Sequence, residues 1–446
     1  MISMKVSAHQ LSLKPRSGNN ANSYPRSNIR HLLFAGIACL LALPSAPAQT
    51  VSGSGLTRLD VSPLINPTAT VAGATAINNS GQAVGNATIG GYDHAVIYSG
   101  GSVTDLGTLG GSTSYALAIN DAGQVVGFST IAGGQKRAFL YSGGIMTNLG
   151  ALGGTSSQAF GINNSGDIIG SLYNAPYSPF AQRAFLYSGG TMSDLGTLGG
   201  NNAIAGAINN AGQIAGQSEN SSGTFKVFIY AGGVMTNLGL TINLDSLKRV
   251  NGINASGKIV GTFGDHAFLA SAGVVTDLGT LQGSPNANAM AINSAGWIVG
   301  GSHNRAYVYI AGTMIDLNTI FAANLITDGV SEGFVSLQQA NGINDAGQIV
   351  GFGSYRDGGG NFHQAAFELT VTSVIAEPRP SLSIKRSGNE VEVSWPVGQV
   401  AYTLHSTPVL PPVSWTAITS GITQSGGRCS YNTVPVGNIY YRLQAN

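Results

Sequence analysis

A basic residue or a histidine recurs eleven positions ahead of an aspartate or asparagine at six places in the chain. The six pairs are His94 and Asp105, Arg137 and Asn148, Arg183 and Asp194, Lys226 and Asn237, His266 and Asp277, and Arg305 and Asp316. In a hairpin with a two-residue glycine turn, Phe185 would lie opposite Asp194, with Arg183 diagonally beside it on the same face. Pairs of this kind fix hairpin register and contribute roughly 0.2 to 1 kcal/mol each.

An alternative interpretation makes the basic members a ring of cationic groups on one rim of the molecule. Such a ring would bind the carboxylate or sulfate groups of a polysaccharide. Its members are Arg137, Arg183, Lys226, His266 and Arg305. Because the pair recurs in nearly every unit, and binding sites usually break symmetry, the spacing favours a structural role.

Two insertions interrupt the regular spacing, at 174–182 and at 321–339. Irregular loops on a regular scaffold are where binding residues usually lie. The candidates for a ligand site in and near the second insertion are Asp328, Glu332, Arg356, Asp357 and His363.

Motifs of known catalytic and metal sites are absent from the sequence. It contains no His-x-x-x-His or Cys-x-x-Cys spacing, and no Gly-x-Ser-x-Gly between a strand and a helix. The Gly-Gly runs at Gly110 and Gly199 lead into strands rather than into helices that would bind phosphate. We therefore expect no catalytic residue, no metal and no cofactor.

The elements that position these residues repeat along the chain. Seven Ile-Asn pairs recur at steps of 42, 43, 46, 45, 39 and 51 residues, a period typical of propeller blades. The pairs begin at Ile77, Ile119, Ile162, Ile208, Ile253, Ile292 and Ile343. Between them, short apolar runs alternate with turn residues, which predicts four strands in each unit.

One complete unit occupies 116–150. Asn120 to Gly123 forms a tight turn between the first two strands, since Asn and Asp bond to their own backbone and Gly accepts a positive φ. The third strand, 138–141, is apolar at nearly every position, so both of its faces must be covered.

The two ends of the array complement each other. The seventh unit has three strands, at 341–344, 348–352 and 365–369, whereas an unpaired fourth strand stands at 56–60. These ends predict an all-β, seven-bladed propeller over 56–370, closed by the N-terminal strand; a linear solenoid would need capping ends instead.

The motif at 138–144, Ala-Phe-Leu-Tyr-Ser-Gly-Gly, and the motif Asp-Leu-Gly-Thr-Leu-Gly-Gly at 194–200 resemble the HAF-repeat family. That family consists of probable extracellular bacterial repeat proteins. The histidine of the name stands at His94 and His266. The resemblance implies export and no defined activity.

The N-terminus, 1–48, reads as a cleavable signal peptide. Basic residues precede a short apolar run, and Ala46-Pro47-Ala48 supplies the cleavage pattern; lipid attachment at Cys39 is the alternative. This segment holds five of the 20 Lys and Arg and none of the 19 Asp and Glu, so the remainder has a formal net charge of −4. We expect secretion, no nucleic-acid partner, no membrane span in the mature chain and, with Cys429 alone, no internal disulfide.

The C-terminal residues differ from the repeats. A proline-containing linker, 371–380, is followed at 381–446 by six alternating stretches, which predict a small β-sandwich similar to fibronectin-like modules. Trp395 and Trp415 are expected to be core anchors; the alternative is that they present faces on which sugars stack.

Together these features predict a secreted, non-catalytic binding or scaffold protein that engages extracellular polysaccharide or a cell-surface protein. The alternative is a polysaccharide hydrolase or lyase on a propeller, by analogy of fold. Two carboxylates about 5 to 10 Å apart in a central cleft would favour that alternative.

Overall fold

The computed structural model describes residues 4–6, 49–59, 71–173, 182–239, 247–375, 383–387, 390–396, 402–407, 416–425, 428–434 and 439–445. The chain divides into two compact units. Residues 51–372 make up one, and residues 1–50 together with 373–446 make up the other. Among the described residues, no helix has both the length and the apolar character needed to cross a membrane.

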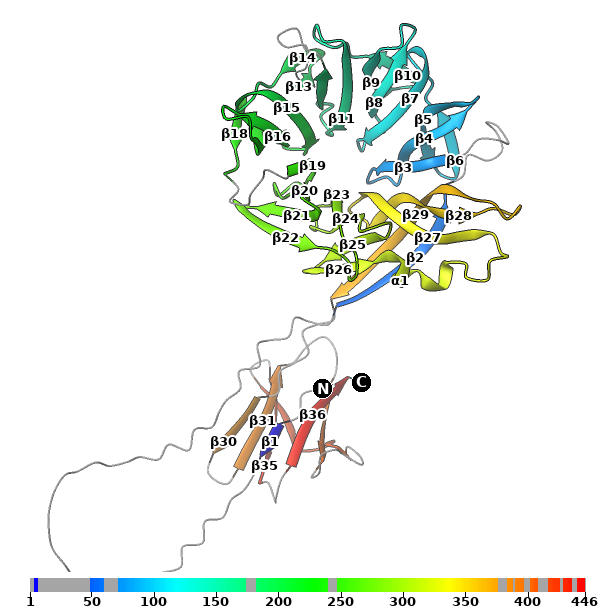
Figure 1. Ribbon diagram of the computed structural model, residues 1–446. Helices are drawn as coiled ribbons and strands as arrows, with labels where there is room; N and C mark the ends of the chain where they lie inside the picture. Colours follow the sequence, from blue (N-terminus) through cyan, green and yellow to red (C-terminus); the bar gives the residue numbers. More distant parts are fainter. Residues whose placement is uncertain are drawn as a thin grey trace, which may run out of the picture. The chain divides into compact units, whose positions relative to one another are not determined.

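Residues 51–372 form seven four-stranded antiparallel sheets that follow one another around a ring, a seven-bladed β-propeller (Figure 1). Each sheet is open, and the hydrogen-bonded pairing of strands is confined to the four strands of one sheet. The first sheet comprises β3 (Val71–Ile77), β4 (Ala83–Ile89), β5 (Tyr92–Ser99) and β6 (Ser102–Asp105), and the second comprises β7 (Gly110–Ile119), β8 (Val125–Ile131), β9 (Lys136–Ser142) and β10 (Ile145–Asn148). The third comprises β11 (Ser156–Ile162), β12 (Ile168–Tyr173), β13 (Gln182–Ser188) and β14 (Thr191–Asp194), and the fourth comprises β15 (Gly199–Ile208), β16 (Ile214–Asn220), β17 (Phe225–Ala231) and β18 (Val234–Asn237). The fifth comprises β19 (Leu247–Ile253), β20 (Ile259–Phe263), β21 (His266–Ser271) and β22 (Val274–Gly279), and the sixth comprises β23 (Asn288–Ile292), β24 (Ile298–Gly301), β25 (Ala306–Ile310) and β26 (Thr313–Asp316).

The seventh sheet joins both ends of this unit. Its strands are β27 (Gly333–Ile343), β28 (Gln348–Arg356), β29 (Phe362–Ile375) and, next to β29, the N-terminal β2 (Gln49–Arg58). The Leu59 amide donates to the Ala366 carbonyl at 3.0 Å, just as the Leu195 amide donates to Ala184 at 2.9 Å inside the third sheet. The predicted pairing of the segment 56–60 with 365–369 is therefore present as far as the described residues extend, to Leu59. A short helix, α1 (Leu317–Ile320), and a 3₁₀ turn (Ala322–Asn324) precede β27.

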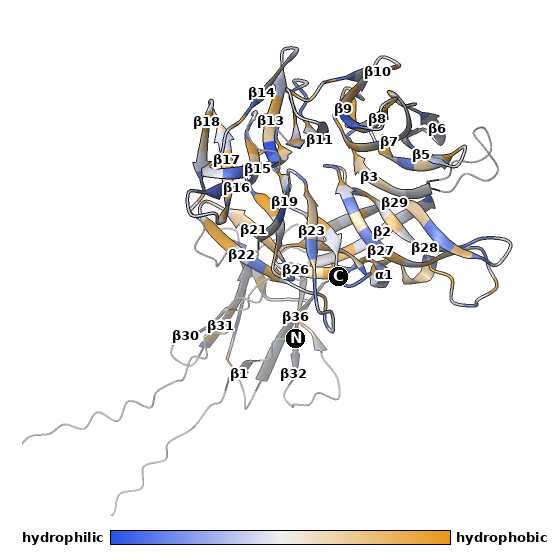
Figure 2. Ribbon diagram, turned by 45° about the horizontal axis from the view of Figure 1, so that its top comes forward, coloured by the Kyte–Doolittle hydropathy of each residue, from blue (hydrophilic) through white to orange (hydrophobic). Residues whose placement is uncertain are grey.

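Hydrophobic cores lie between neighbouring sheets rather than within one centre. Ala138 and Leu149 of the second unit pack with Ile168 and Phe185 of the third in one cluster. A further cluster joins Ala366 of the seventh sheet to residues of the first. Figure 2 shows the hydrophobic residues spread along the strands of all the sheets. Both faces of the apolar third strands are thus covered, as predicted.

The asparagine of every Ile-Asn pair makes two kinds of hydrogen bond. Its Oδ1 accepts the backbone amide four residues on, as from Gln124 to Asn120 at 2.9 Å, which forms the predicted turn. Its Nδ2 donates to the backbone carbonyl of the equivalent asparagine in the next sheet, as from Asn120 to Asn163 at 3.0 Å. These donations run in sequence around the whole ring, from Asn78 through Asn120, Asn163, Asn209, Asn254, Asn293 and Asn344 back to Asn78, at 3.0 to 3.4 Å. We call these seven residues the asparagine circle.

The second unit contains two four-stranded sheets. One comprises β30 (Ser383–Ser387), β31 (Glu390–Pro396), β35 (Arg428–Thr433) and β34 (Ile422–Ser425); the other comprises β1 (Met4–Val6), β36 (Ile439–Ala445), β32 (Tyr402–Thr407) and β33 (Thr416–Ala417). Val393 and Trp395 of the first sheet share a core with Leu404 and Tyr441 of the second.

Several expectations for the terminal segments meet the structure only in part. Trp395 is 3% exposed and lies in the core, so it offers no face to a sugar; Trp415 lies outside the described residues. β29 continues to Ile375, so the first half of the segment expected to be a linker is strand. The expected signal peptide and Cys39 lie outside the described residues, apart from β1, and β2 begins directly after the expected cleavage point.

Candidate functional site

Four of the six spaced pairs are ion pairs across the outer hairpin. Arg183 Nε and Nη2 donate to the two carboxylate oxygens of Asp194 at 2.9 and 3.1 Å, and Phe185 lies opposite Asp194 as predicted. The other three pairs join His94 to Asp105 at 2.9 Å, His266 to Asp277 at 2.7 Å and Arg305 to Asp316 at 3.2 Å. The cationic groups of Arg183 and Arg305 are therefore already neutralised.

The two pairs with asparagine behave differently. Arg137 donates to the carbonyl of Thr155 at 2.6 Å, and Asn148 accepts the amide of Gly150 at 2.8 Å. Every Asp or Asn in this position accepts the backbone amide two residues further on. The turn that follows the outer strand needs a side-chain oxygen, and either residue type supplies it. This explains why Asp and Asn alternate here, and it supports the structural interpretation over a cationic ring; Lys226, beside Asn237, shows no ion pair within the described part of the chain.

The candidates from the second insertion gather at one end of the seventh sheet. Glu332 accepts the Tyr355 hydroxyl at 2.9 Å and lies 3.7 Å from Nη1 of Arg58, whose guanidinium is 4.5 Å from the centre of the Tyr355 ring. The ring of His363 tilts against the same tyrosine at 5.6 Å. The sequence did not single out Arg58 or Tyr355, because β2 is far from this insertion along the chain.

The acidic candidates of this cluster mainly hold loops together. Asp328 accepts the Ser331 hydroxyl and the amides of Ser331 and Val330, and these bonds lower its pKa to about 2. Asp357 accepts the amide of Asn361 at 2.8 Å, which lowers its pKa. Arg356 donates from Nη1 to the carbonyl of Val330. These side chains thus bond mainly to backbone groups and a hydroxyl of the loops around them. The first insertion, 174–182, lies outside the described residues except for its last residue.

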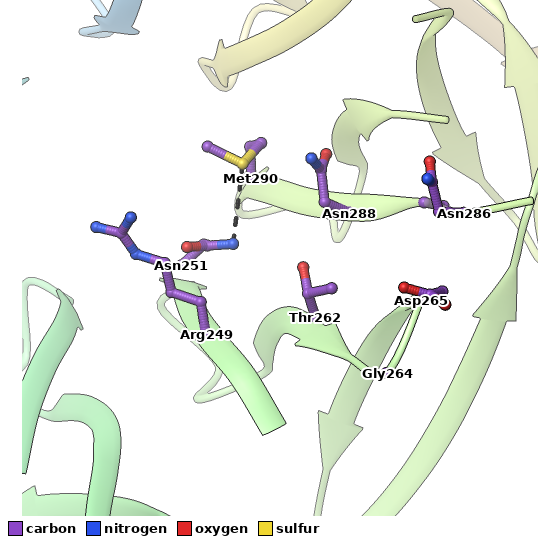
Figure 3. A pocket seen from close by; sticks show the side chains of 9 residues that line it. Arg249, Asn251, Thr262, Gly264, Asp265, Asn286, Asn288 and Met290 are labelled. Atoms are coloured by element: carbon purple, nitrogen blue, oxygen red, sulfur yellow. Dashed lines mark hydrogen bonds between the residues drawn. The ribbon is translucent and has the colours of Figure 1, made fainter. Parts of the chain in front are cut away.

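A pocket of about 400 Å³ opens between the fifth and sixth sheets, beside strands that line the middle of the ring (Figure 3). Arg249 and Asn251 reach it from β19, Thr262 from β20, and Asn288 and Met290 from β23. Gly264, Asp265, Asn286 and Ala287 complete its lining. None of these residues was among the candidates from the sequence.

The pocket forms where a contact that is present at the next interface is missing. At the next interface, Gln339 Nε2 donates to Asn288 Oδ1 at 3.0 Å, and this bond between amides joins the two sheets. In the fifth sheet, Arg249 stands at the position that corresponds to Gln339 of the seventh sheet. Its guanidinium, however, lies 5.5 Å from the ring centre of Phe160, in the third sheet. The space between the fifth and sixth sheets therefore stays open.

Most of the residues that line the pocket are polar, and one of them is a cation. Arg249 is exposed, and no ion pair or hydrogen bond of its side chain is present among the described residues. Burial raises the pKa of Tyr173, and the positive charge of Arg249 partly offsets this rise. The Asn251 amide donates to the Ala289 carbonyl at 2.7 Å, so its oxygen remains as an acceptor. Asp265 is the one carboxylate among the lining residues that the structure describes.

The signal for this pocket was present in the repeat. The residues that stand at the position of Arg249 in the other units are Gly73, Tyr115, Gln158, Ile204, Asn288 and Gln339. An arginine at a position that is otherwise uncharged breaks the symmetry, which is the mark of a site. For metal ions, no group of three or more His, Cys, Asp or Glu side chains is close enough together within the described ranges.

No family model matches the chain, and no curated protein matches it. Among solved structures, the extracellular domain of a putative one component system from B. thetaiotaomicron is 12% identical with a TM-score of 0.44, over 78% of this chain and 45% of that one. TolB from Acinetobacter baumannii is 15% identical with a TM-score of 0.33, over 46% of this chain and 51% of that one. An oligogalacturonate lyase from Vibrio parahaemolyticus is 8% identical with a TM-score of 0.38, over 73% and 98%. The chain thus spans about half the length of the first two.

Proposed function

We propose that this protein is a secreted, non-catalytic binding protein that holds a hydroxyl-rich ligand, a saccharide segment, in the pocket between its fifth and sixth sheets. The observation that carries the proposal is the break in symmetry at Arg249. Six units carry an uncharged residue at this position, whereas the fifth unit places a cation, with no ion pair among the described residues, beside amide and hydroxyl groups.

The composition of the pocket supports recognition rather than chemistry. Saccharide sites use planar amide, hydroxyl and guanidinium groups that can donate to and accept from hydroxyls. Glycoside hydrolysis usually needs two carboxylates flanking the bond. Among the described lining residues Asp265 is the one carboxylate, so these residues do not supply that pair, and no observation favours the alternative of a hydrolase or lyase.

The proposal includes three features from the sequence. The protein is exported through a signal peptide cleaved after Ala48 and belongs with the HAF-repeat proteins. Its ring is closed by β2, for which the pairing of Leu59 with Ala366 is the support. Its C-terminal unit is a fibronectin-like sandwich, supported by two sheets with a common core.

A glycan array probed with the purified chain 49–446 tests the binding function. We expect saturable binding to a subset of glycans, with no release of shortened products. Replacing Asn286, an exposed lining residue, by Trp should block the pocket and abolish binding while the melting temperature holds. The matched control is Asn201→Trp, an exposed asparagine on the fourth sheet away from the pocket, which should bind normally.

Two results would overturn the proposed function. One is the absence of binding to any glycan on the array. The other is cleavage of a glycan by the purified chain, which would make the protein an enzyme.

A further inference from the structure

We infer that the saccharide bound in this pocket carries a carboxylate, so that the ligand class is a uronic-acid-containing glycan, with Arg249 as the residue that binds the carboxylate. The inference rests on the proposed function and adds the chemical class of the ligand. It follows from the charge, the hydrogen-bonding groups and the apolar surface around the pocket.

The first step is the charge of Arg249. A guanidinium presents N–H donors in a planar fork that matches the two oxygens of a carboxylate. Elsewhere in the propeller this geometry is already used, since Arg183 binds both oxygens of Asp194. Within the described part of the chain, the Arg249 guanidinium contacts the face of Phe160, at 5.5 Å, and makes no ion pair or hydrogen bond, so its donors can bind a ligand.

The second step is the number of charges that the pocket can accept. Among the described residues of the lining Arg249 is the single cation, and Asp265 lies across the pocket from it in Figure 3. A phosphate monoester, whose charge at neutral pH is about −1.5 to −2, would meet more repulsion from this carboxylate than a group with one negative charge. A ligand with one negative charge and several hydroxyls avoids this, because hydroxyls can donate to the Asp265 side.

The third step is the polar and apolar groups between these two ends. The oxygen of Asn251 and the hydroxyl of Thr262 can bind sugar hydroxyls, and Met290 offers apolar surface to the C–H face of a sugar ring. A volume of about 400 Å³ is near the lower end of small-molecule pockets, which suits one or two sugar rings. The acidic group of the ligand therefore lies toward β19 and its hydroxyls toward β20 and β23.

Isothermal titration calorimetry of the chain 49–446 with defined trimers tests the inference. The probes are the trimers of galacturonate and of mannuronate, each compared with its methyl ester, which removes the charge and keeps the shape. We expect at least one acidic trimer to bind at least tenfold more tightly than its ester, and the difference to shrink as salt is raised.

Variants of Arg249 make the test specific. Arg249→Met should reduce binding of the acidic trimer at least tenfold and leave binding of the ester within about twofold, with an unchanged melting temperature because Arg249 is exposed. Arg249→Lys should retain part of the preference for the acid, since it keeps the charge and loses the fork. The control Arg183→Met alters an arginine outside the pocket and should leave both affinities unchanged.

Equal binding of the acids and their esters, or an unchanged preference in Arg249→Met, would overturn the inference. If the same protein still binds neutral glycans and Asn286→Trp blocks that binding, the proposed function stands and only the ligand class is wrong. Failure to bind any glycan on the array overturns both.

Discussion

At the scale of single residues, the asparagine circle shows why one side chain recurs in every unit. Asn has both an acceptor and a donor on a short side chain. The acceptor stabilises the local turn, and the donor reaches the backbone carbonyl of the next sheet. All seven of these asparagines are 3 to 5% exposed, so a lost bond could not be replaced by water. Asp lacks the donor and Ser lacks the reach, which confines the position to Asn.

Replacing Asn120 by Asp tests this requirement. The variant keeps the acceptor for the Gln124 amide but turns a carboxylate oxygen toward the Asn163 carbonyl in a buried place. We expect the free energy of unfolding to fall by about 2 to 4 kcal/mol, measured by urea denaturation.

The matched control for that variant is Asn148→Asp, in the turn after β10. Its oxygen accepts only the Gly150 amide, and a carboxylate there reproduces the arrangement of Arg183 and Asp194 with Arg137 as partner. Stability should change by less than about 0.5 kcal/mol. A similar loss in both variants would mean that the donor to the next sheet contributes nothing.

The spaced pairs lead to a second prediction, in which Asp194→Asn and Asp194→Ala separate two contributions. The Asn variant keeps the acceptor for the Gly196 amide and loses the ion pair with Arg183, whereas the Ala variant loses both. Because both charged side chains are only partly buried, we expect the Asn variant to cost at most about 1 kcal/mol and the Ala variant about 1 kcal/mol more. Thermal unfolding in low and high salt checks this; a cost for the Asn variant equal to that of the Ala variant would show that the ion pair dominates.

At the scale of the strand, a glycine recurs in the second strand of each of the seven propeller sheets, because a carbonyl group of the first strand lies too close to leave room for a side chain. A bulge in the first strand brings its carbonyl over that glycine. A Cβ at Gly216 would lie 2.2 Å from the Ile204 carbonyl oxygen and 2.6 Å from the ring of Phe228. The side chain of Phe228 fills the space that the glycine leaves.

Gly216→Ala should therefore destabilise the protein by about 3 kcal/mol or more, because backbone and a buried ring would both have to move. Gly133→Ala is the control, since its Cβ would meet only the flexible end of Gln135 at 2.5 Å, and it should change stability by less than about 1 kcal/mol. Chemical denaturation of the two variants side by side measures the difference, and equal stability of both would refute the steric explanation.

Strands and turns could be predicted from the sequence where the interactions that form them join residues close together in the chain. The turn at Asn120 and the hairpin that places Phe185 opposite Asp194 depend on residues close together in the chain. The donation from Asn120 to the next sheet and the pocket beside Arg249 depend on which strands meet across the ring, which spacing alone does not reveal. Arg58 was missed for the same reason, since its contacts with Tyr355 and Glu332 join segments about 300 residues apart.

At the scale of the whole propeller, stability depends on contacts between units rather than on one centre. Each cluster of core residues belongs to two adjacent sheets, and the cluster shared by the seventh and first sheets completes the set. In such an array every sheet is covered only if both of its neighbours are present. Because β2 pairs with β29, it joins the N-terminal end of the propeller to the seventh sheet and so connects the two ends of the array.

A chain that begins at Thr70 tests this arrangement against one that begins at Gln49. Without β2 the strand β29 becomes an exposed edge, and Phe367 and neighbouring core residues lose the cover of Leu56 and Val51. We expect the shorter chain to unfold over a broad temperature range, whereas the longer one melts in a single sharp transition in calorimetry. Leu59→Ala in the longer chain, a milder change, should keep the sharp transition and lower the stability by about 1 to 3 kcal/mol. A peptide of residues 49–60 added to the shorter chain should restore part of the cooperativity; sharp melting of the shorter chain without that peptide would show that β2 does not hold the ring together.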